Sequence, residues 1–344
     1  MKKNNYTIKR NFLKKIFIKF CRAFGYELID QSNFYNPTQN KSLNEDLNIQ
    51  GVKSIILPMG ETIISRKVTA LTVIFRSCTN VNMLTQSKKR IFDDKKSEYT
   101  FRSLNSIIVS LQKAKEKFNS IKFDIIVIDH NSKREDLNQM QNQLDKSKIK
   151  NSIISLNVSE FSAGIKKVNA ENKTVTDNQI SNMSNINKSL IIAKKQCSDL
   201  IYFVEDDYLH DKASFVEMIS TYERVSSQLN RELILCPADY PYLYSKAEPT
   251  SIFLGTSRHW RVVSETLCTF LTSSNLLEKH WDHFVSMCLY EHLPFEEPLH
   301  KIYKTEYCIS PIPSLALHFT NVNSVYGLSP LIDWKKIWDE NSDY

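Results

Sequence analysis

Hydrophobic residues in the middle of the chain form short runs that are separated by segments with the spacing of helices. The runs predict strands at 70–78, 123–132, 152–158, 199–204 and 232–240. The intervening segments predict helices near 99–118, at 135–146, around 184–196 and at 212–229. Strands that alternate with helices imply right-handed crossovers, so we expect an α/β fold with a mostly parallel sheet and helices on both faces.

The pattern changes outside this region. Residues 31–50 are polar and rich in Asn and read as a linker, and 54–65 predict a small hairpin. Beyond residue 250 we expect a long β-ribbon over 251–274, helices near 275–291 and 297–304, and an irregular end. The chain is therefore expected to contain a basic amphipathic helix at 1–30, a linker and hairpin at 31–66, one large domain at 67–330, and a C-terminal tail at 331–344.

The N-terminal segment has apolar residues on one side of a predicted helix and basic residues mostly on the other. The apolar set is Phe12, Leu13, Ile16, Phe17, Phe20 and Phe24. The basic set is Lys14, Lys15, Lys19 and Arg22. Cationic helices with aromatic faces bind anionic lipid surfaces, so residues 8–24 are expected to contact a membrane. The alternative is an ordinary docking helix with a solvated charged face.

Composition narrows the classes of partner. The 344-residue chain has a net charge of +7, but residues 1–22 carry eight basic residues and no acid, so the remainder is close to neutral. A nucleic-acid binder would show a basic field over the whole protein, and this class is not expected. Seven scattered cysteines without a C-x-x-C pair indicate reduced thiols and a cytoplasmic setting. We therefore expect peripheral attachment to the inner face of a membrane.

The scarcity of glycine excludes two kinds of nucleotide-binding loop. The chain has only six glycines, and no two are close together. Both the G-x-G-x-x-G loop and the G-x-x-x-x-G-K-[ST] loop are therefore absent from the sequence. If the protein binds a nucleotide, another group has to neutralise the phosphates.

Three adjacent acids, Glu205, Asp206 and Asp207, end the apolar run 200–204. Ligands bind at the carboxyl ends of strands in open parallel sheets, and Asp129 ends another predicted strand. Alternation along the backbone lets Glu205 and Asp207 share one side while Asp206 faces another partner. Mg²⁺ or Mn²⁺ held there would offset the carboxylate repulsion and bind a diphosphate. The alternative is that the acids cap the next helix and favour its dipole.

The stretch "LIYFVEDDYLHDKASFVEMI" resembles the metal-binding segment of glycosyltransferases with the GT-A fold, whose D-x-D motif ends a core strand. The E-D-D form resembles that of N-acetylglucosaminyltransferase I, and the layout of residues 68–320 resembles the family-2-like bacterial sugar transferases. The resemblance implies that Asp207 coordinates the metal directly. It also implies that Glu205 and Asp206 contact ribose, donor sugar or metal-bound water, and Glu205 is a further candidate metal ligand.

The same resemblance assigns residues around the nucleotide. It implies that Arg76 and Ser77 line the nucleotide base and that Asp129 contacts the base or ribose. Family members follow the second strand with D-D-G-S or a similar sequence, whereas this chain has "DHNS". The base that it accepts is therefore not fixed by the sequence.

A catalytic base is expected at "LPFEEPLHKIY". GT-A enzymes carry an x-E-D motif here, and its last acid corresponds to Glu297, preceded by Glu296. A carboxylate in this place would remove the proton from the acceptor hydroxyl. The alternative is two acids in the first turn of a surface helix, with Asp282 as the reserve base. By the same resemblance His318 completes a metal site that suits Mn²⁺ better than Mg²⁺, and the alternative is a core histidine.

The predicted ribbon contains "SRHWR", where Arg258 and Arg261 are expected to pair with the pyrophosphate and Trp260 to stack on a sugar. The alternative is an amphipathic ribbon whose Trp packs inward. Two further expectations concern Asp239 and Tyr240, beside the cleft, and His280 and His283, as helix-surface histidines. The Q-x-x-R-W signature of processive enzymes is missing, so we expect one sugar per encounter.

The leading hypothesis is a metal-dependent, inverting glycosyltransferase. It would transfer one sugar from a nucleotide-diphosphate sugar to a hydroxyl of a glycan or lipid-linked acceptor. The pathway would be synthesis of a bacterial surface glycan such as lipopolysaccharide, capsule or lipid-linked oligosaccharide. One alternative is a sugar-nucleotide nucleotidyltransferase, although those enzymes have a glycine-rich loop after the first strand. The other is a non-catalytic, membrane-surface glycan-binding protein.

Overall fold

The computed structural model describes residues 12–26, 63–80, 91–245, 250–319 and 325–344. The chain divides into two units, Met1–Ile63 and Ile64–Tyr344. In the first unit the structure describes helix α1 (Phe12–Ala23), while the predicted linker and most of the predicted hairpin lie outside the described residues. Among the helices that are described, none combines the length and the apolar character needed to cross a membrane.

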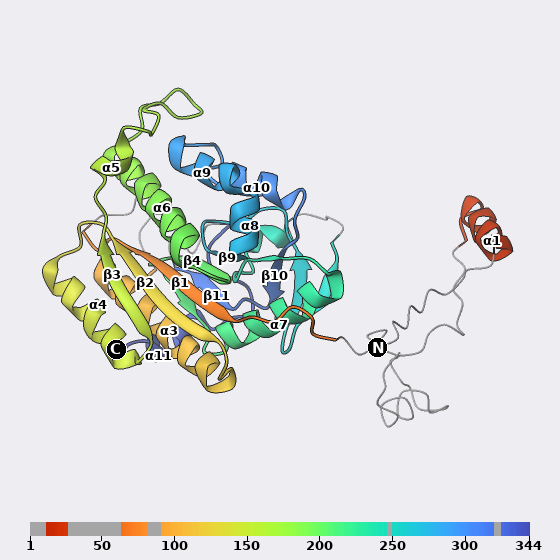
Figure 1. The fold of residues 1–344 in the computed structure, drawn as a ribbon, viewed down its shortest axis with the longest axis horizontal. Coiled ribbons are helices and arrows are strands. Elements are labelled where there is room, and N and C mark those ends of the chain that lie inside the picture. Colours follow the sequence, from red (N-terminus) through yellow and green to blue (C-terminus); the bar gives the residue numbers. More distant parts are fainter. Residues whose placement is uncertain (1–11, 27–62, 81–90, 246–249, 320–324) are drawn as a thin grey trace. The chain divides into compact units, whose positions relative to one another are not determined.

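The second unit is built on a nine-stranded sheet (Figure 1). In spatial order its strands are β3 (Lys150–Ser155), β2 (Lys122–Asp129), β1 (Ala70–Ser77), β4 (Leu200–Glu205), β9 (Phe270–Ser273), β6 (Ile234–Leu235), β10 (Cys308–Ile312), β8 (His259–Val262) and β7 (Ile252–Leu254). The pairings make β8 and β9 antiparallel to their neighbours, and the other strands run in one direction. The predicted α/β fold with a mostly parallel sheet is confirmed.

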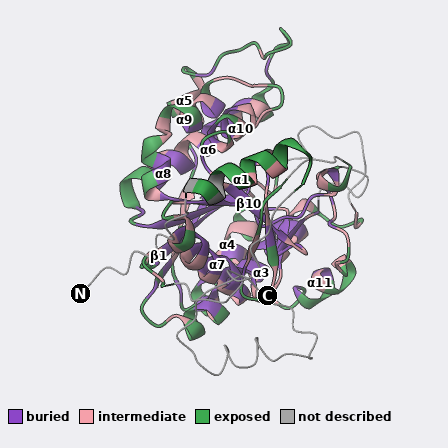
Figure 2. Cartoon of the chain, turned by 90° about the vertical axis from the view of Figure 1, so that its right-hand side faces the viewer, coloured by how far each residue is buried: buried purple, intermediate pink, exposed green. Residues whose placement is uncertain are grey.

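Helices cover both faces of this sheet (Figure 1). On one face α3 (Lys96–Lys117) packs against α4 (Arg134–Ser147) and α7 (Ser214–Leu229). On the other face α6 (Asp177–Gln196) packs against α8 (Ser274–Lys279) and α9 (Trp281–Leu289). The central strands are consequently buried and the outer surfaces of the helices are exposed (Figure 2). Burial on both faces explains why β1 and β4 read as continuous apolar runs.

The remaining short elements are listed here: α5 (Ser159–Ser162), β5 (Tyr208–His210), a 3₁₀ helix η2 (Pro241–Tyr244), α10 (Glu297–Tyr303), β11 (Ala316–His318) and α11 (Trp334–Glu340). Helix α6 begins before the predicted residue 184. Its first turn is fixed by a capping box, in which Gln179 Oε1 accepts from Thr176 N at 2.7 Å and Thr176 Oγ1 accepts from Gln179 N at 3.3 Å.

Two predicted β-segments are shorter than expected. The strand expected at 232–240 is reduced to β6, because Pro237 has no N–H to donate to a ladder. The ribbon expected at 251–274 is divided: β7 and β8 form a hairpin, whereas β9 leaves it and inserts between β4 and β6. Local patterns do not specify such an insertion.

The β7–β8 hairpin is anchored to α7 by one buried carboxylate. Glu217 accepts hydrogen bonds from Thr256 N at 3.0 Å, from Ser257 N at 2.9 Å and from Trp260 Nε1 at 3.2 Å. Burial raises the pKa of Glu217, but the hydrogen bonds from Trp260 and Ser257 outweigh it, and the net pKa is lowered. A Cβ on Gly255 would lie 2.2 Å from Glu217 Oε1, so this turn requires glycine.

The end of the chain is not the irregular tail that we expected. Helix α11 places Trp338 in a small second core, where its ring centroid lies 4.2 Å from that of Phe92 and 4.7 Å from that of Tyr99. The guanidinium of Arg102 lies 4.3 Å from the Trp338 ring centroid, which also ties α11 to α3. Residues 331–344 therefore belong to the second unit.

A two-stranded sheet brings a distant segment to the end of β4. Strand β11 pairs antiparallel with β5, with His318 opposite Tyr208. In addition, Phe319 N donates to Asp207 O at 2.9 Å. The acid motif and His318 are therefore neighbours in space although more than a hundred residues separate them in the chain.

Candidate active site

Of the three acids at the end of β4, Asp206 faces away from the other two. It accepts from Cys78 N at 3.1 Å and from Thr100 Oγ1 at 2.8 Å, and it forms an ion pair with Lys96. These contacts join the end of β1 to the first turn of α3. The expected separation of alternate side chains is thus observed. The expected contact of Asp206 with a donor is not supported, because local groups already occupy its oxygens.

Glu205 is held by an arginine from the neighbouring strand. Arg76 Nη2 lies 2.9 Å from Glu205 Oε1, and Arg76 Nη1 donates to Asn182 Oδ1 at 3.0 Å. Burial raises the pKa of Glu205, and the charge of Arg76 partly offsets this rise. Arg76 therefore neutralises Glu205 within the acid cluster, and its expected place beside a nucleotide base stays a prediction.

Asp207 forms a pair with His318. His318 Nε2 lies 3.2 Å from Asp207 Oδ2. On its other side, His318 Nδ1 donates to the backbone oxygen of Tyr326 at 3.0 Å, and the ring stacks on Tyr208 with centroids 4.7 Å apart. Burial lowers the pKa of His318, but the contact with Asp207, the charge of Glu205 and the hydrogen bond to Tyr326 together outweigh it, and the net pKa is raised. The imidazole is thus fixed in orientation with Nε2 directed at the carboxylate.

The donor atoms of this pair fit a divalent ion. A histidine whose Nδ1 donates to a carbonyl presents Nε2 as its ligand atom, and such a second contact is usual for metal-binding histidines. Among the residues that the structure describes, no three His, Cys, Asp or Glu side chains are grouped as a metal site. Mg²⁺ and related ions commonly take only one or two protein carboxylates and complete their shell with water and substrate phosphates. Asp207 and His318 fit that mode, with Glu205 directed at Arg76.

Glu296 lies next to this group. It precedes α10, is partly buried, and accepts from Cys268 Sγ at 3.8 Å. Burial raises the pKa of Glu296 to about 7, and the charge of Glu205 adds to the rise while His318 opposes it. A carboxyl with a pKa near neutrality can accept a proton and release it again at physiological pH.

Glu297 points elsewhere. Its side chain is 41% exposed and contacts Lys301 Nζ at 2.8 Å and His292 Nδ1 at 3.1 Å. The hydrogen bond from Lys301 is the main cause that lowers the pKa of Glu297. The geometry therefore favours Glu296 over Glu297 as a base, which reverses the expected order. The reserve candidate Asp282 is exposed on α9.

Asp129 is held by Ser77 from the neighbouring strand β1 and by Ser132 from the turn that follows β2. Ser77 Oγ donates to Asp129 Oδ1 at 2.7 Å, and Ser132 N donates to Asp129 Oδ2 at 3.1 Å. Asp129 is only 3% exposed. Because both carboxylate oxygens already accept hydrogen bonds, one from β1 and one from the turn after β2, the expected contact with a nucleotide base is not supported.

The ribbon residues are structural. Trp260 is fully buried and bonded to Glu217, so the expectation that it stacks on a sugar is wrong and the packing alternative holds. Arg261 pairs with the fully buried Asp239. Arg258 Nη1 donates to the backbone oxygen of Pro313 at 3.0 Å. These contacts commit both guanidinium groups to the fold, where we expected them to meet a pyrophosphate.

The expectations for Tyr240 and for the two histidines can also be compared with the structure. Tyr240 is buried, and its hydroxyl lies 2.7 Å from that of Tyr208, so it supports the site from within the core. His280 Nε2 contacts Glu306 Oε1 at 2.9 Å, and the ring centroids of His280 and His283 lie 6.1 Å apart. His280 is only 13% exposed and contacts the buried Glu306, so it is not a surface side chain, whereas His283 is exposed on α9 as the helix-surface interpretation predicts.

The structure adds residues to the site that the sequence did not indicate. Tyr208 stacks on His318, Tyr326 contributes a backbone oxygen, and Cys268 contacts Glu296. Tyr208 follows the acid motif directly, and that position is a signal that could have suggested it. A backbone acceptor such as that of Tyr326 leaves no trace in the residue types.

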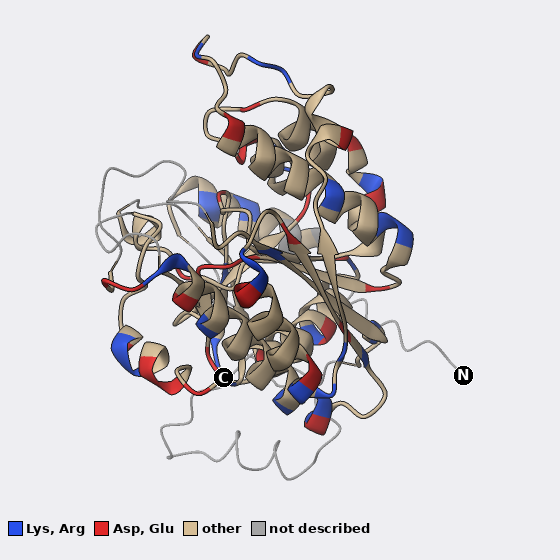
Figure 3. Ribbon diagram, turned by 90° about the vertical axis from the view of Figure 1, so that its left-hand side faces the viewer, with Lys and Arg blue, Asp and Glu red and all other residues tan. Residues whose placement is uncertain are grey.

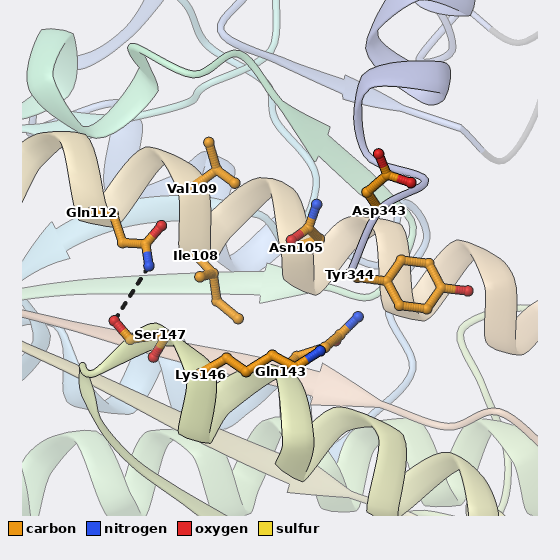
Figure 4. A pocket seen from close by; sticks show the side chains of 9 residues that line it. All are labelled: Asn105, Ile108, Val109, Gln112, Gln143, Lys146, Ser147, Asp343 and Tyr344. Atoms are coloured by element: carbon orange, nitrogen blue, oxygen red, sulfur yellow. Dashed lines mark hydrogen bonds between the residues drawn. The ribbon is translucent and has the colours of Figure 1, made fainter.

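A separate pocket of about 500 Å³ lies between α3, α4 and the end of the chain (Figure 4). Its lining residues are Asn105, Ile108, Val109, Gln112, Gln143, Lys146, Ser147, Asp343 and Tyr344. None of the residues that the sequence predicts for the active site lines it.

On the face shown in Figure 3, basic and acidic residues alternate over the helices, which agrees with the absence of a basic field in the sequence outside residues 1–22.

Comparisons with known proteins show low similarity only. No family model matches the chain, and no curated protein matches it. A UDP-glucose pyrophosphorylase solved with UDP-glucose is similar at 8% identity and a TM-score of 0.40, over 79% of this chain and 96% of that chain.

Two further solved structures are similar to the same degree. The galactosyltransferase LgtC, solved with donor and acceptor sugar analogues, has 10% identity and a TM-score of 0.38, over 79% of this chain and 95% of that chain. An inositol-1-phosphate CTP transferase from T. maritima has 9% identity and a TM-score of 0.35, over 81% and 98%. These proteins catalyse different reactions, so the reaction of this chain has to be argued from its own residues.

Proposed function

We propose that the unit Ile64–Tyr344 is a metal-dependent glycosyltransferase that uses a nucleoside-diphosphate sugar and a hydroxyl acceptor. One observation carries the proposal: Asp207 at the end of β4 pairs with His318 from a distant segment, and the charges of Glu205 and His318 act on Glu296 from a third segment. The carboxyl edge of an open α/β sheet is where such folds bind ligands.

Asp207 and His318 are the residues that would hold Mn²⁺ or Mg²⁺. When bound there, the ion would supply positive charge to the diphosphate of the donor and to its leaving group. Arg76 pairs with Glu205 and Lys96 pairs with Asp206, so Asp207, which pairs with His318, is the acid of the three that would face the ion. A nitrogen ligand from His318 favours Mn²⁺ over Mg²⁺.

Glu296 is the proposed base. Its carboxylate would accept the proton of the acceptor hydroxyl while that oxygen bonds to the anomeric carbon of the donor sugar. The bond between the anomeric carbon and the diphosphate breaks, and its electron pair leaves with the nucleoside diphosphate. A single displacement of this kind inverts the anomeric configuration. The raised pKa of Glu296 suits the role, because a base poised near the working pH transfers protons most efficiently.

The acceptor class comes from the motif. The resemblance of the E-D-D segment to bacterial sugar transferases favours a bacterial surface glycan or its lipid-linked precursor as the acceptor. The absence of the Q-x-x-R-W signature favours transfer of one sugar per encounter.

The test is to incubate the protein with UDP-, GDP-, dTDP-, ADP- and CMP-linked sugars, Mn²⁺ and a bacterial envelope extract, and to measure released nucleotide and glycosylated product. We expect one donor class to be consumed by the wild type and by Asp282→Asn, with loss of at least about a hundredfold in Asp207→Asn and His318→Gln. Full turnover in both site variants would overturn the assignment. Pyrophosphate release from a nucleoside triphosphate would instead identify a nucleotidyltransferase.

A further inference from the structure

Helix α1 presents an exposed apolar stripe. The exposed fractions are 59% for Phe17, 60% for Phe20 and 65% for Phe24, and Leu13 and Ile16 are exposed as well (Figure 2). With 3.6 residues per turn, Leu13, Ile16, Phe17 and Phe20 fall within an arc of about 100° on one side of α1, and Phe24 directly follows the last turn. The rings of Phe20 and Phe24 lie 4.8 Å apart and form a continuous aromatic surface.

Basic residues occupy the opposite side. Lys19 and Arg22 lie on the far side of α1 from the aromatic stripe, and the first turn of the helix has no acid. Residues 1–22 contain eight basic residues and no acid, so the segment carries the positive charge of the chain at one end. A second copy of α1 would bring the same charges together and repel, whereas an anionic surface would attract them.

We propose that α1 lies flat in the interface of an anionic lipid bilayer, with its aromatic stripe at the acyl boundary and Lys19 and Arg22 at the lipid phosphates. A 12-residue helix is about 18 Å long, too short to span a bilayer and suited to lie along its surface. Apolar burial and attraction to anionic headgroups act together in such helices. This inference does not depend on the proposed reaction.

The experiment is co-sedimentation of the full-length chain with vesicles of phosphatidylcholine alone and of phosphatidylcholine with about 30% phosphatidylglycerol. We expect stronger binding to the anionic vesicles, which falls when the salt concentration rises to about 0.5 M. Phe17→Ser combined with Phe20→Ser should lower the partition coefficient at least about tenfold. Lys19→Gln combined with Arg22→Gln should lower it about tenfold on anionic vesicles and leave neutral vesicles unaffected.

Ile18→Ser is the matched control, because Ile18 lies on the polar side of the same helix and is less exposed than its neighbour Phe17. It should change the partition coefficient by about twofold or less. Helix α1 belongs to the unit Met1–Ile63 and, in the part of the chain that the structure describes, contributes nothing to the hydrophobic core clusters of Ile64–Tyr344, so every variant should keep the melting temperature of the wild type. That readout separates loss of binding from loss of folding.

Several outcomes would overturn the inference. These are equal binding to neutral and anionic vesicles, no binding at all, or an equal loss in Ile18→Ser and in the double Phe variant. A wild-type chain that ignores vesicles but forms dimers, which the double Phe variant loses, would assign the stripe to a second copy. If the wild-type chain binds anionic vesicles but transfers no sugar from any donor, the proposed function is rejected and the membrane inference stands.

Discussion

Glu296 is the side chain whose protonation state decides the proposed chemistry. It is partly buried beside Glu205 and His318, and its pKa is about 7. Glu296→Gln keeps the shape and removes the base, so kcat should fall by about 10²–10⁴-fold. Glu297→Gln is the matched control, since it removes a solvent-exposed ion pair with Lys301 and should change kcat by less than about threefold. Equal losses in the two variants would reject Glu296 as the base.

The rate should depend on pH through the same residue. Glu296 accepts a proton only when ionised, so kcat/KM should rise with pH and level off above an apparent pKa of about 7. The measurement is kcat/KM from pH 5 to 9 at saturating Mn²⁺. A plateau that extends below pH 6 would show that Glu296 does not limit the reaction.

Stability gives an independent readout of Glu296. Its pKa in the folded protein, about 7, lies above its ordinary value of 4.5, so it contributes stability at low pH that is lost as the pH rises through 7. At pH 8, Glu296→Gln should therefore be more stable than the wild type by about 1–3 kcal/mol in urea denaturation. At pH 4 the difference should disappear. A variant that loses both activity and stability would indicate a structural role.

Backbone geometry explains which of the site residues could be predicted from the sequence and which could not. The alternation of Glu205, Asp206 and Asp207 is a property of extended backbone, and the observed separation of Asp206 agrees with it. The choice between Glu296 and Glu297 depends on where α10 begins, because adjacent residues at a helix start point in different directions. A local pattern does not resolve a boundary to one residue.

At the scale of elements, the β7–β8 turn depends on the absence of a side chain at Gly255. Gly255→Ala places a Cβ 2.2 Å from Glu217 Oε1 and 2.6 Å from Trp260 Nε1, so the buried hydrogen bonds have to shift. We expect a loss of about 2–4 kcal/mol in the free energy of unfolding, measured in urea. Gly164→Ala is the control, because its nearest contact is 3.6 Å and its effect should stay within about 1 kcal/mol. Similar losses at both positions would contradict this account of the turn.

The strands with continuous apolar runs were predictable because two covered faces require them, as β1, β2 and β4 show. The division of the expected ribbon could not be predicted, because β9 pairs with β4 and β6 instead of with β8. The pairing partner of β9 depends on tertiary packing. The burial of Trp260 has the same origin. A Trp beside two arginines suits a sugar platform equally well until Glu217 is seen to accept its N–H.

On the scale of the whole molecule, α11 completes the second core. Trp338 is 3% exposed and packs against Phe92, Tyr99 and Phe319. Trp338→Ala should lower the free energy of unfolding by about 3–5 kcal/mol. Trp334→Ala is the control in the same helix, because Trp334 is partly exposed and should cost clearly less. If Trp338→Ala lowers the free energy of unfolding no more than Trp334→Ala does, Trp338 is not part of an ordered core.

The contact between Asp207 and His318 is also a property of the whole molecule. Each residue type suits a metal site by itself, but their approach depends on the pairing of β5 with β11 across more than a hundred residues. Both residues were predicted as metal ligands from a family resemblance, and the pairing of β5 with β11 explains how they come into contact. The tyrosine oxygen that orients His318 belongs to the backbone and has no signature in the sequence.

The central claim is that Asp207 and His318 form a metal-dependent diphosphate site, and a thermal-shift panel tests it most directly. The protein is heated with UDP, GDP, dTDP, ADP or CMP, each with Mn²⁺ and again with EDTA, and the wild type is compared with Asp207→Ala and Asp282→Ala. We predict that one nucleotide raises the melting temperature by about 4 °C or more, only with Mn²⁺ and only in the wild type and Asp282→Ala. A shift that persists in EDTA or in Asp207→Ala, or no shift with any nucleotide, would contradict the account.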